Sequence, residues 1–371
     1  MKKTSALVTV AILGINGADS PSPGLILSQC LRHHISLPVR VIALVGNPFT
    51  DGIQAVNHAD EVVVVPSPDT LPRAFTERVG ELARRLSPLV LLPGGTAEWL
   101  ALIPLRRELQ ATGVSLLFPP ERVVNELFPF PARKKFGKGI EVPKGHVFDR
   151  DLRPLFKMAW RFPLRLRARD GTTAVAATRE ELERKIARYR LHSMAPLSIH
   201  EIVPGDEISV ASLGDQRGRP VGWVAARVLS RSDNGAIWSA VTVNDPATAP
   251  IVARLLSAIA WPGPLTLTLT VSPGHVSLTG IEPGFPGWVS LAVAAGLDLP
   301  LQYLRLALGT RVLQAPSYRA GLFLARVSVD QPTDVTALSR LVTQGACSDA
   351  TDRSTDLRAT ADRATGARHH R

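Results

Sequence analysis

The sequence predicts an α/β protein whose first third is built around a parallel sheet. Two observations lead to this fold class. Short, continuously apolar runs recur along residues 1–118, and segments with the apolar spacing of helices separate the later runs. Strands that are buried on both faces and covered by helices produce this pattern. The first run also enters a loop rich in glycine and proline before a helical segment, as at the start of a doubly wound unit.

The elements of this first domain follow in order, with strands predicted from the apolar runs and helices from the 3.6-residue spacing. The expected strands are 4–13, 39–45, 61–65, 89–92 and 115–118, and the expected helices are 25–35, 71–86 and 97–112. Residues 1–118 are therefore expected to form a Rossmann-like domain. The loop at 16–24 lacks the spacing G-x-G-x-x-G and contains two prolines, so a nicotinamide site is not expected.

Length and composition limit the number of domains and the kinds of partner. With 371 residues, 45% of them hydrophobic, the chain is long enough for two or three domains. The formal charge of +11 raises the question of a nucleic-acid partner. The basic residues are dispersed apart from one cluster at 133–138, which argues against nucleic-acid binding. Cys30 and Cys347 are far apart and have no metal-binding spacing, so structural zinc is not expected.

The start of the chain imitates a secretory leader, because two lysines precede an apolar run. Residues 14–19 are a poor small-residue cleavage site, so a buried first strand is the expected structure. The most apolar later segment, 288–308, is interrupted by charged residues and a proline, which does not suit a bilayer span. We therefore expect a cytoplasmic protein without a membrane partner.

The middle of the chain predicts a linker followed by a small subdomain. Six prolines interrupt residues 119–161, which leaves room only for short helices. Residues 162–168 alternate leucine with arginine, as a half-exposed strand does. Residues 178–182 have the pattern of a capping box, which predicts a helix that continues to Tyr189.

A hinge between two lobes is predicted at Ile199–Val210. Its apolar residues alternate with polar ones on both sides of Pro204-Gly205, which is typical of two short strands with a tight connection. The run Glu201-Ile202-Val203-Pro204-Gly205-Asp206-Glu207 resembles a signature of the ATP-grasp enzymes. The resemblance implies that Glu201, Ile202 and Val203 line an adenine pocket and that Glu207 takes the acidic position after the turn. An ordinary surface hairpin is the alternative.

Two further segments resemble the same family. Residues 162–168 resemble the strand whose lysine reaches the nucleotide phosphates, and Arg167 stands at that lysine. An arginine keeps the charge but is not interchangeable with lysine, and a solvated basic stripe is the alternative. The first domain resembles the one that precedes the ATP-grasp core, where Glu98 stands as a substrate contact. An acidic residue in the first turn of a helix is an equally ordinary explanation of Glu98.

The metal-binding end of the family pattern is altered. In the family, two carboxylates and an asparagine on neighbouring strands hold magnesium. If Phe285-Pro286-Gly287-Trp288 is aligned with the family's "F-P-x-W", Gly280 replaces a glutamate and Glu282 replaces the asparagine. The strand at 265–270 presents threonines on one face by its period of two. Glu282 is left as a single candidate metal ligand.

The predicted domains are 1–118, a Rossmann-like domain; 119–198, a linker and ATP-grasp lid; 199–330, the ATP-grasp core; and 331–371, a largely disordered tail. Disorder is expected because residues 348–371 have almost no apolar side chains. This division is consistent with the α/β class.

The resemblance, to the carboxylate-amine ligases and carbamoyl-phosphate synthase-like members of the superfamily, implies a nucleotide-binding protein with ATP as its cofactor. Because the magnesium ligands are changed, we expect ligase catalysis to be weakened or lost. One alternative is an active ligase that forms an acyl phosphate and transfers it to an amine, with Arg167 and Glu282 as catalytic substitutes and an acid and an amine as unnamed substrates. Another is a scaffold module that holds no nucleotide. Homodimerisation stays open.

Overall fold

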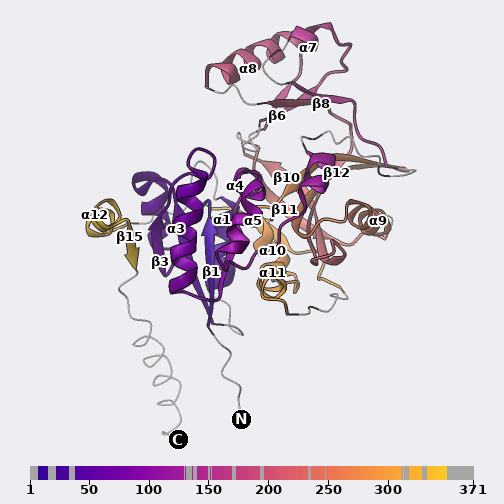
Figure 1. Cartoon of the computed structure of the whole chain (residues 1–371). Helices are drawn as coiled ribbons and strands as arrows, with labels where there is room; N and C mark the ends of the chain where they lie inside the picture. The colour runs from indigo at the N-terminus through magenta and orange to yellow at the C-terminus, as the bar shows by residue number, and fades with distance from the viewer. Residues whose placement is uncertain are drawn as a thin grey trace, which may run out of the picture.

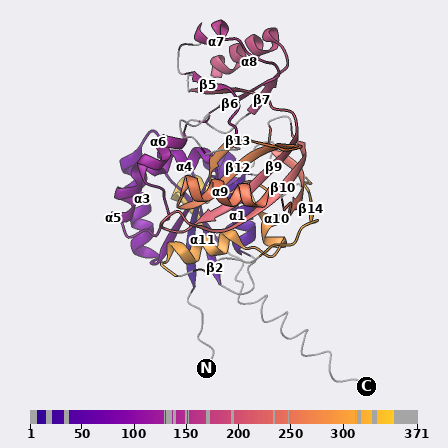
Figure 2. The same cartoon turned by 90° about the vertical axis from the view of Figure 1, so that its right-hand side faces the viewer.

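The chain folds around three sheets in a computed structural model (Figures 1 and 2). Its described residues are 7–15, 22–32, 38–128, 130, 136, 140–148, 151, 153–168, 173–192, 196–232, 235–246, 248–310, 312, 317–327 and 332–348. The mixed α/β class predicted from the sequence is confirmed. No helix in these ranges is both long enough and apolar enough to cross a membrane.

The first sheet is the predicted parallel sheet, with β15 added at one edge in the order β15-β3-β2-β1-β4. Its strands β1, β2, β3 and β4 are buried along almost their whole length, as strands between two layers of helices should be. The bounds are β1 Val8–Leu13, α1 Pro23–Arg32, β2 Val39–Val45, a π-helix Pro48–Gly52, α2 Ile53–Val56, β3 Glu61–Val64, α3 Pro72–Arg85 and β4 Leu89–Pro93.

Two expectations for this domain differ from the structure. The single helix expected at 97–112 is divided into α4 (Thr96–Leu102), a 3₁₀ turn (Ile103–Leu105) and α5 (Arg106–Ala111). Pro104 lies in that turn, where its missing N–H interrupts the helical hydrogen bonds. The strand expected at 115–118 forms only an isolated bridge between Ser115 and Val90.

The C-terminal segment returns to the first sheet. Helix α12 (Val335–Gln344) begins at Asp334, whose carboxylate accepts a hydrogen bond from the Thr336 N–H, and ends at Gly345. Strand β15 (Ala346–Ser348) then pairs antiparallel with β3, so both elements lie beside β3 (Figure 1). The expected tail is therefore wrong for residues 332–348, because Leu341 and Cys347 are buried there; residues 349–371 lie outside the described ranges.

The segment predicted as a lid, called the lid below, is an antiparallel sheet in the order β5-β8-β6-β7, with two helices on its outer side (Figure 2). The leucines of β6 point to the helices and form a small separate core with residues such as Phe148 and Leu182. The elements are α6 Glu121–Leu127 in the linker, then β5 Gly145–Phe148, α7 Arg153–Lys157, β6 Leu164–Ala168, β7 Thr173–Ala176, α8 Arg179–His192 and β8 Leu197–Glu201. The predicted boundary at 198/199 falls inside β8, and the chain leaves the lid after Glu201.

The largest sheet is antiparallel, with the order β13-β12-β9-β10-β11-β14. Strand β9 starts at Asp206, so residues 202–205 cross from the lid to this core sheet. Gly205 has φ +146°, and a Cβ there would lie 2.6 Å from the Val271 carbonyl oxygen, so the crossing requires glycine. The bounds are β9 Asp206–Gly214, β10 Pro220–Arg231, β11 Ile237–Val243, α9 Ala249–Ile259, β12 Gly263–Ser272, β13 His275–Pro283, α10 Val289–Ala294, α11 Leu299–Ala307 and β14 Phe323–Ala325.

The first domain and the core sheet share one continuous apolar core, whereas the lid has its own. The Tyr303 hydroxyl on α11 donates a hydrogen bond to the Leu91 carbonyl of β4, with an O–O distance of 2.9 Å. Trp99 on α4 is fully buried and packs against Gly284, where a Cβ would lie 2.7 Å from the indole. This packing fixes the first domain against the strands that carry the predicted site.

Candidate functional site

A cleft of about 410 Å³ lies where the first domain, the lid and the core sheet meet. Gly95 to Glu98 line it from the start of α4, Arg167 lines it from lid strand β6, and Thr266, Thr268 and Glu282 line it from core strands β12 and β13. The structure therefore brings together Arg167 and Glu282, which are 115 residues apart in the sequence (282 minus 167).

Strand β6 explains how the lid presents its charges. Its leucines are buried in the lid core, so by the alternation of a strand Arg165 and Arg167 share the other face. In the register with β8, His200 lies opposite Arg165 and Ser198 lies opposite Arg167. The Leu/Arg pattern thus separates a packed face from a charged face, and the charged face is turned to the core sheet.

Arg167 forms an ion pair across the cleft. Its Nη2 lies 2.8 Å from Oε1 of Glu282, and the two side chains are 13% and 33% exposed. The Nε and Nη1 atoms of Arg167 are buried and have no hydrogen-bond partner in the structure. A buried guanidinium nitrogen without an acceptor is costly, so Arg167 retains two unsatisfied donors in this structure.

A second charge cluster lies on the same side of the core sheet. Arg165 Nη2 lies 3.1 Å from Oε2 of Glu207, and Arg231 at the end of β10 also pairs with Glu207. Burial pushes the pKa of Glu207 upward, but Arg231 and Arg165 outweigh it and leave the pKa below its usual value. Glu207 is thus an ionised partner of two arginines that links the lid to the core.

The predicted adenine residues lie at the crossing between lid and core. The Glu201 carboxylate accepts a hydrogen bond from the Arg161 N–H at 2.9 Å, and the Ile202 N–H donates to the Pro163 carbonyl at 3.0 Å. Ile202 and Val203 are half-buried. These residues are not among the described residues that line the 410 Å³ cleft; they lie beside the start of lid strand β6.

The core wall of the cleft does not fit magnesium. This ion requires a near-octahedral shell of oxygens that normally includes carboxylates. Core strands β12 and β13 offer one carboxylate, Glu282, which is already paired with Arg167, and Gly280 offers no side chain. The Thr266 hydroxyl donates to the Gly284 carbonyl at 2.9 Å. Across the described ranges, no group of three or more His, Cys, Asp and Glu side chains is arranged to hold a metal ion.

Glu98 forms the first-domain wall. Its Oε2 accepts a hydrogen bond from the Gly95 N–H at 3.0 Å, and its carboxylate packs on Gly14 at the end of β1. Burial raises the pKa of Glu98, with Asp51 and Asp69 adding to the effect. The same carboxylate also lines a pocket of about 190 Å³ at the carboxyl ends of β1, β2 and β3. Glu98 therefore lines two pockets, and its hydrogen bond at the start of α4 is the one expected of an acidic residue in the first turn of a helix.

His200 lies in the charged face of the lid sheet. It is 2% exposed, its ring meets Phe130 edge to face, and its Nδ1 has no hydrogen-bond partner in the structure. Burial lowers its pKa to about 3, and Arg167 and Arg165 reinforce the effect. The imidazole is therefore neutral, which avoids a third positive charge beside two guanidinium groups.

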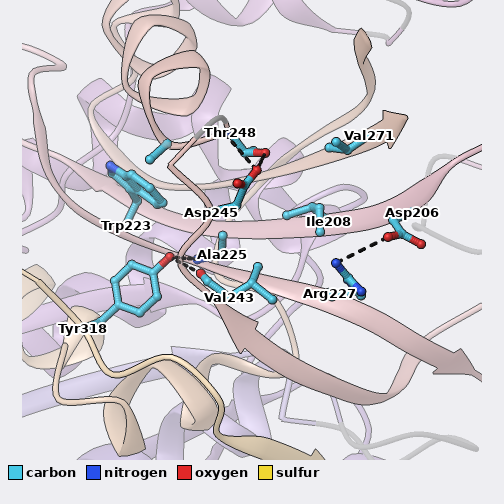
Figure 3. A pocket seen from close by; sticks show the side chains of 11 residues that line it. Asp206, Ile208, Trp223, Ala225, Arg227, Val243, Asp245, Thr248, Val271 and Tyr318 are labelled. Carbon is cyan, nitrogen blue, oxygen red and sulfur yellow. Dashed lines mark hydrogen bonds and ion pairs between the residues drawn. The ribbon is translucent and has the colours of Figure 1, made fainter. Parts of the chain in front are cut away.

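A smaller pocket of about 70 Å³ lies on the opposite face of the core sheet (Figure 3). Its polar groups are already engaged: the Tyr318 hydroxyl donates to the Val243 carbonyl, Asp245 accepts from Thr248, and Arg227 lies 3.4 Å from Asp206. This pocket is a gap between the core sheet and neighbouring segments of the same chain. Unlike the cleft, it is not lined by the unpaired donor atoms of Arg167.

Sequence reasoning missed three residues of this region. Arg231 and Arg326 both line the cleft, and Arg326 donates to the Gly287 carbonyl while burial lowers its pKa. His200 was missed although it stands next to Glu201. A signal for His200 was present, because pairing the Leu/Arg strand with the strand at the hinge places it on the arginine face.

No family model and no curated protein matches the sequence. Solved structures do match the fold. Biotin carboxylase from Campylobacter jejuni, in a beta-gamma-ATP complex, has a TM-score of 0.59 at 11% identity over 85% of this chain and 74% of that chain. N5-carboxyaminoimidazole synthetase from Staphylococcus aureus, complexed with ADP, has a TM-score of 0.56 at 12% identity, over 84% and 80%. L-amino acid ligase from Bacillus licheniformis has a TM-score of 0.55 at 16% identity, over 81% and 74%.

These neighbours share the ATP-grasp architecture, and the chain has that fold, as the motifs around the hinge predicted. At these identities the likeness concerns the fold alone.

Proposed function

We propose that this protein is a nucleotide-binding relative of the ATP-dependent carboxylate-amine ligases whose ligase catalysis is weakened or lost. The observation that carries the proposal is the cleft in which Arg167 of the lid meets Glu282 of the core. Two neighbours with this fold were solved with an ATP-type ligand or ADP, which supports a nucleotide in the space between lid and core. Glu201, Ile202 and Val203 are the proposed adenine contacts.

Weak catalysis follows from the charges of the core wall. In phosphoryl transfer, bound metal ions neutralise the charge that develops on the transferred group, and such electrostatic stabilisation commonly contributes several kcal/mol. Here Gly280 and the neutral threonines of β12 stand where ligands are needed, and Glu282 is engaged by Arg167. The protein would retain a nucleotide while it accelerates little chemistry.

Binding of ADP and of pyrophosphate, measured by calorimetry on the full chain, tests this function. ADP should bind with a dissociation constant above about 100 µM, because the metal contribution to phosphate binding is missing. Pyrophosphate should bind more weakly than ADP, because it cannot use the contacts at Glu201–Val203. Equal affinities for the two ligands, or no binding of ADP, would overturn the assignment.

An active ligase is the second candidate, and Glu98 favours it. Its carboxyl group stands on the first-domain wall of the cleft, and burial raises its pKa, so a second substrate would meet a carboxyl group that is more readily protonated than an exposed glutamate. Phosphate release from ATP in mixtures of carboxylic acids and amines distinguishes the candidates. Release that requires both substrates would establish the ligase, and release at the level of a protein-free control would support the first proposal.

A further inference from the structure

We infer that the Arg167 guanidinium, in place of a metal ion, neutralises the phosphate charge, so that the cleft binds the magnesium-free phosphate chain of a nucleotide. The inference rests on the proposed function and specifies its ligand: a free nucleoside di- or triphosphate anion. The Arg167 guanidinium, which the lid carries, would take the place of a magnesium ion bound from solution.

The first argument is the position of Arg167. Its Nη2 lies against the site where Gly280 stands, since a Cβ on Gly280 would be 3.3 Å from Nη2 and 3.1 Å from the Thr268 side chain. A larger side chain at 280 would have to share this space with the guanidinium. The absence of a side chain there and the presence of the guanidinium are therefore coupled features of one arrangement.

The second argument is hydrogen bonding. Glu282 engages one edge of the guanidinium through Nη2, and the buried Nε and Nη1 remain without an acceptor. Arginine presents its donors in a rigid planar fork that suits phosphate oxygens. Within the guanidinium, Nε and Nη1 each form a fork with Nη2 and not with each other, so a phosphate group that displaces Glu282 would bind through Nη2 and one of the two atoms that the protein itself leaves unsatisfied.

The third argument is the charge of the surroundings. Arg231 and Arg326 line the same cleft as Arg167, and β12 contributes only neutral hydroxyls. The described lining residues include three arginines and two glutamates, Glu98 and Glu282, and Glu282 is already paired with Arg167. This balance attracts an anion and gives a divalent cation little attraction of its own.

Magnesium should therefore act against binding. In solution it coordinates the same phosphate oxygens and lowers the negative charge that the arginine meets. We expect ADP to bind at least as tightly in excess chelator as in millimolar magnesium. A site built around a metal would give the opposite order.

Two variants test whether Arg167, and not a metal ion, binds the phosphate chain. Arg167→Gln should weaken ADP binding in chelator at least about tenfold, because hydrogen bonds to charged groups are lost. Arg227→Gln is the matched control, since Arg227 lies on the opposite face of the core sheet and pairs with Asp206; it should leave the affinity unchanged. Thermal melts would establish that both variants are folded.

The variant Glu282→Gln distinguishes a cleft in which Glu282 competes with ADP for Arg167 from one in which Glu282 holds a metal ion. If Glu282 competes with the ligand for Arg167, removing its charge should strengthen ADP binding in chelator several-fold. If Glu282 holds a metal, the same variant should weaken binding in magnesium and leave binding in chelator unaffected. This variant keeps the test decisive even where Arg167→Gln fails to fold.

The outcomes can be told apart. ADP binding that is independent of magnesium and survives Arg167→Gln would overturn the inference and leave the proposed function standing. ADP binding that requires magnesium would overturn the inference and, with it, the explanation of weak catalysis by missing metal ligands. Absence of ADP binding with and without magnesium would overturn both. Binding in chelator that is lost in Arg167→Gln and gained in Glu282→Gln would support the inference.

Discussion

At the scale of single residues, the buried charges of the lid face make stability depend on pH. His200 has a folded-state pKa of about 3 against 6.5 for the free side chain. Between these values the unfolded chain binds a proton that the folded chain does not. The contribution of His200 is therefore present above about pH 6.5 and is lost as the pH falls toward 3.

The variant His200→Gln should remove this dependence. From pH 6.5 to pH 5 the free energy of unfolding of the native protein should fall relative to the variant by about 2 kcal/mol, from about 1.4 kcal/mol per pH unit. Urea unfolding at a series of pH values measures the difference. His146→Gln removes an exposed histidine from the same sheet and serves as the control. Parallel curves for the native protein and His200→Gln would contradict a neutral buried imidazole.

At the scale of elements, the C-terminal helix and strand are part of the fold. Leu341 on α12 is 1% exposed, and its Cδ1 lies 3.0 Å from the position of a Cβ on Gly52. Leu341→Ala should therefore lower the free energy of unfolding by about 2–5 kcal/mol, through lost burial and the cavity that remains.

Val342→Ala is the matched change on the same helix, because Val342 is 49% exposed. It should alter stability by less than about 0.5 kcal/mol. Thermal or denaturant unfolding of both variants measures the pair. Equal small effects would mean that α12 contributes little to the stability of the first domain.

At the scale of the whole molecule, the division into two apolar cores predicts two levels of stability. The lid packs its own small core, while the first domain and the core sheet share one; Figure 2 shows the lid set apart from the other two sheets. The described connections of the lid to the core sheet include the ion pairs Arg165–Glu207 and Arg167–Glu282. Units with fewer buried apolar contacts open with a lower free energy.

Hydrogen exchange measures this difference. Amides of lid strands β6 and β8 should exchange faster than those of β1 and β12, and ADP should slow exchange in the lid more than in the first domain. Ligand binding stabilises the conformation to which the ligand binds. Uniform exchange across the three sheets would contradict a separately opening lid.

The sequence by itself determined strands β1 to β4 and the positions of the motifs. Continuous apolar runs are local signals of a buried parallel strand, so β2 was predicted at its observed bounds, and Leu/Arg alternation revealed the two faces of β6. The hinge was likewise readable, since Pro204-Gly205 is a turn signal between two alternating segments. Arg167 and Glu282 were found from motifs whose spacing along the chain is itself informative.

Only the tertiary structure decided what those residues meet. Ion pairing depends on distances between segments far apart in sequence, so the pairing of Arg167 with Glu282, and the two arginines around Glu207, have no local signal. The folded segment at 335–348 was missed because its short apolar stripe becomes stable only against β3 and the first domain. The sequence pattern of an element shows which of its faces is apolar. Which side chains become buried, and which charges pair, depends on contacts between distant segments in the folded chain.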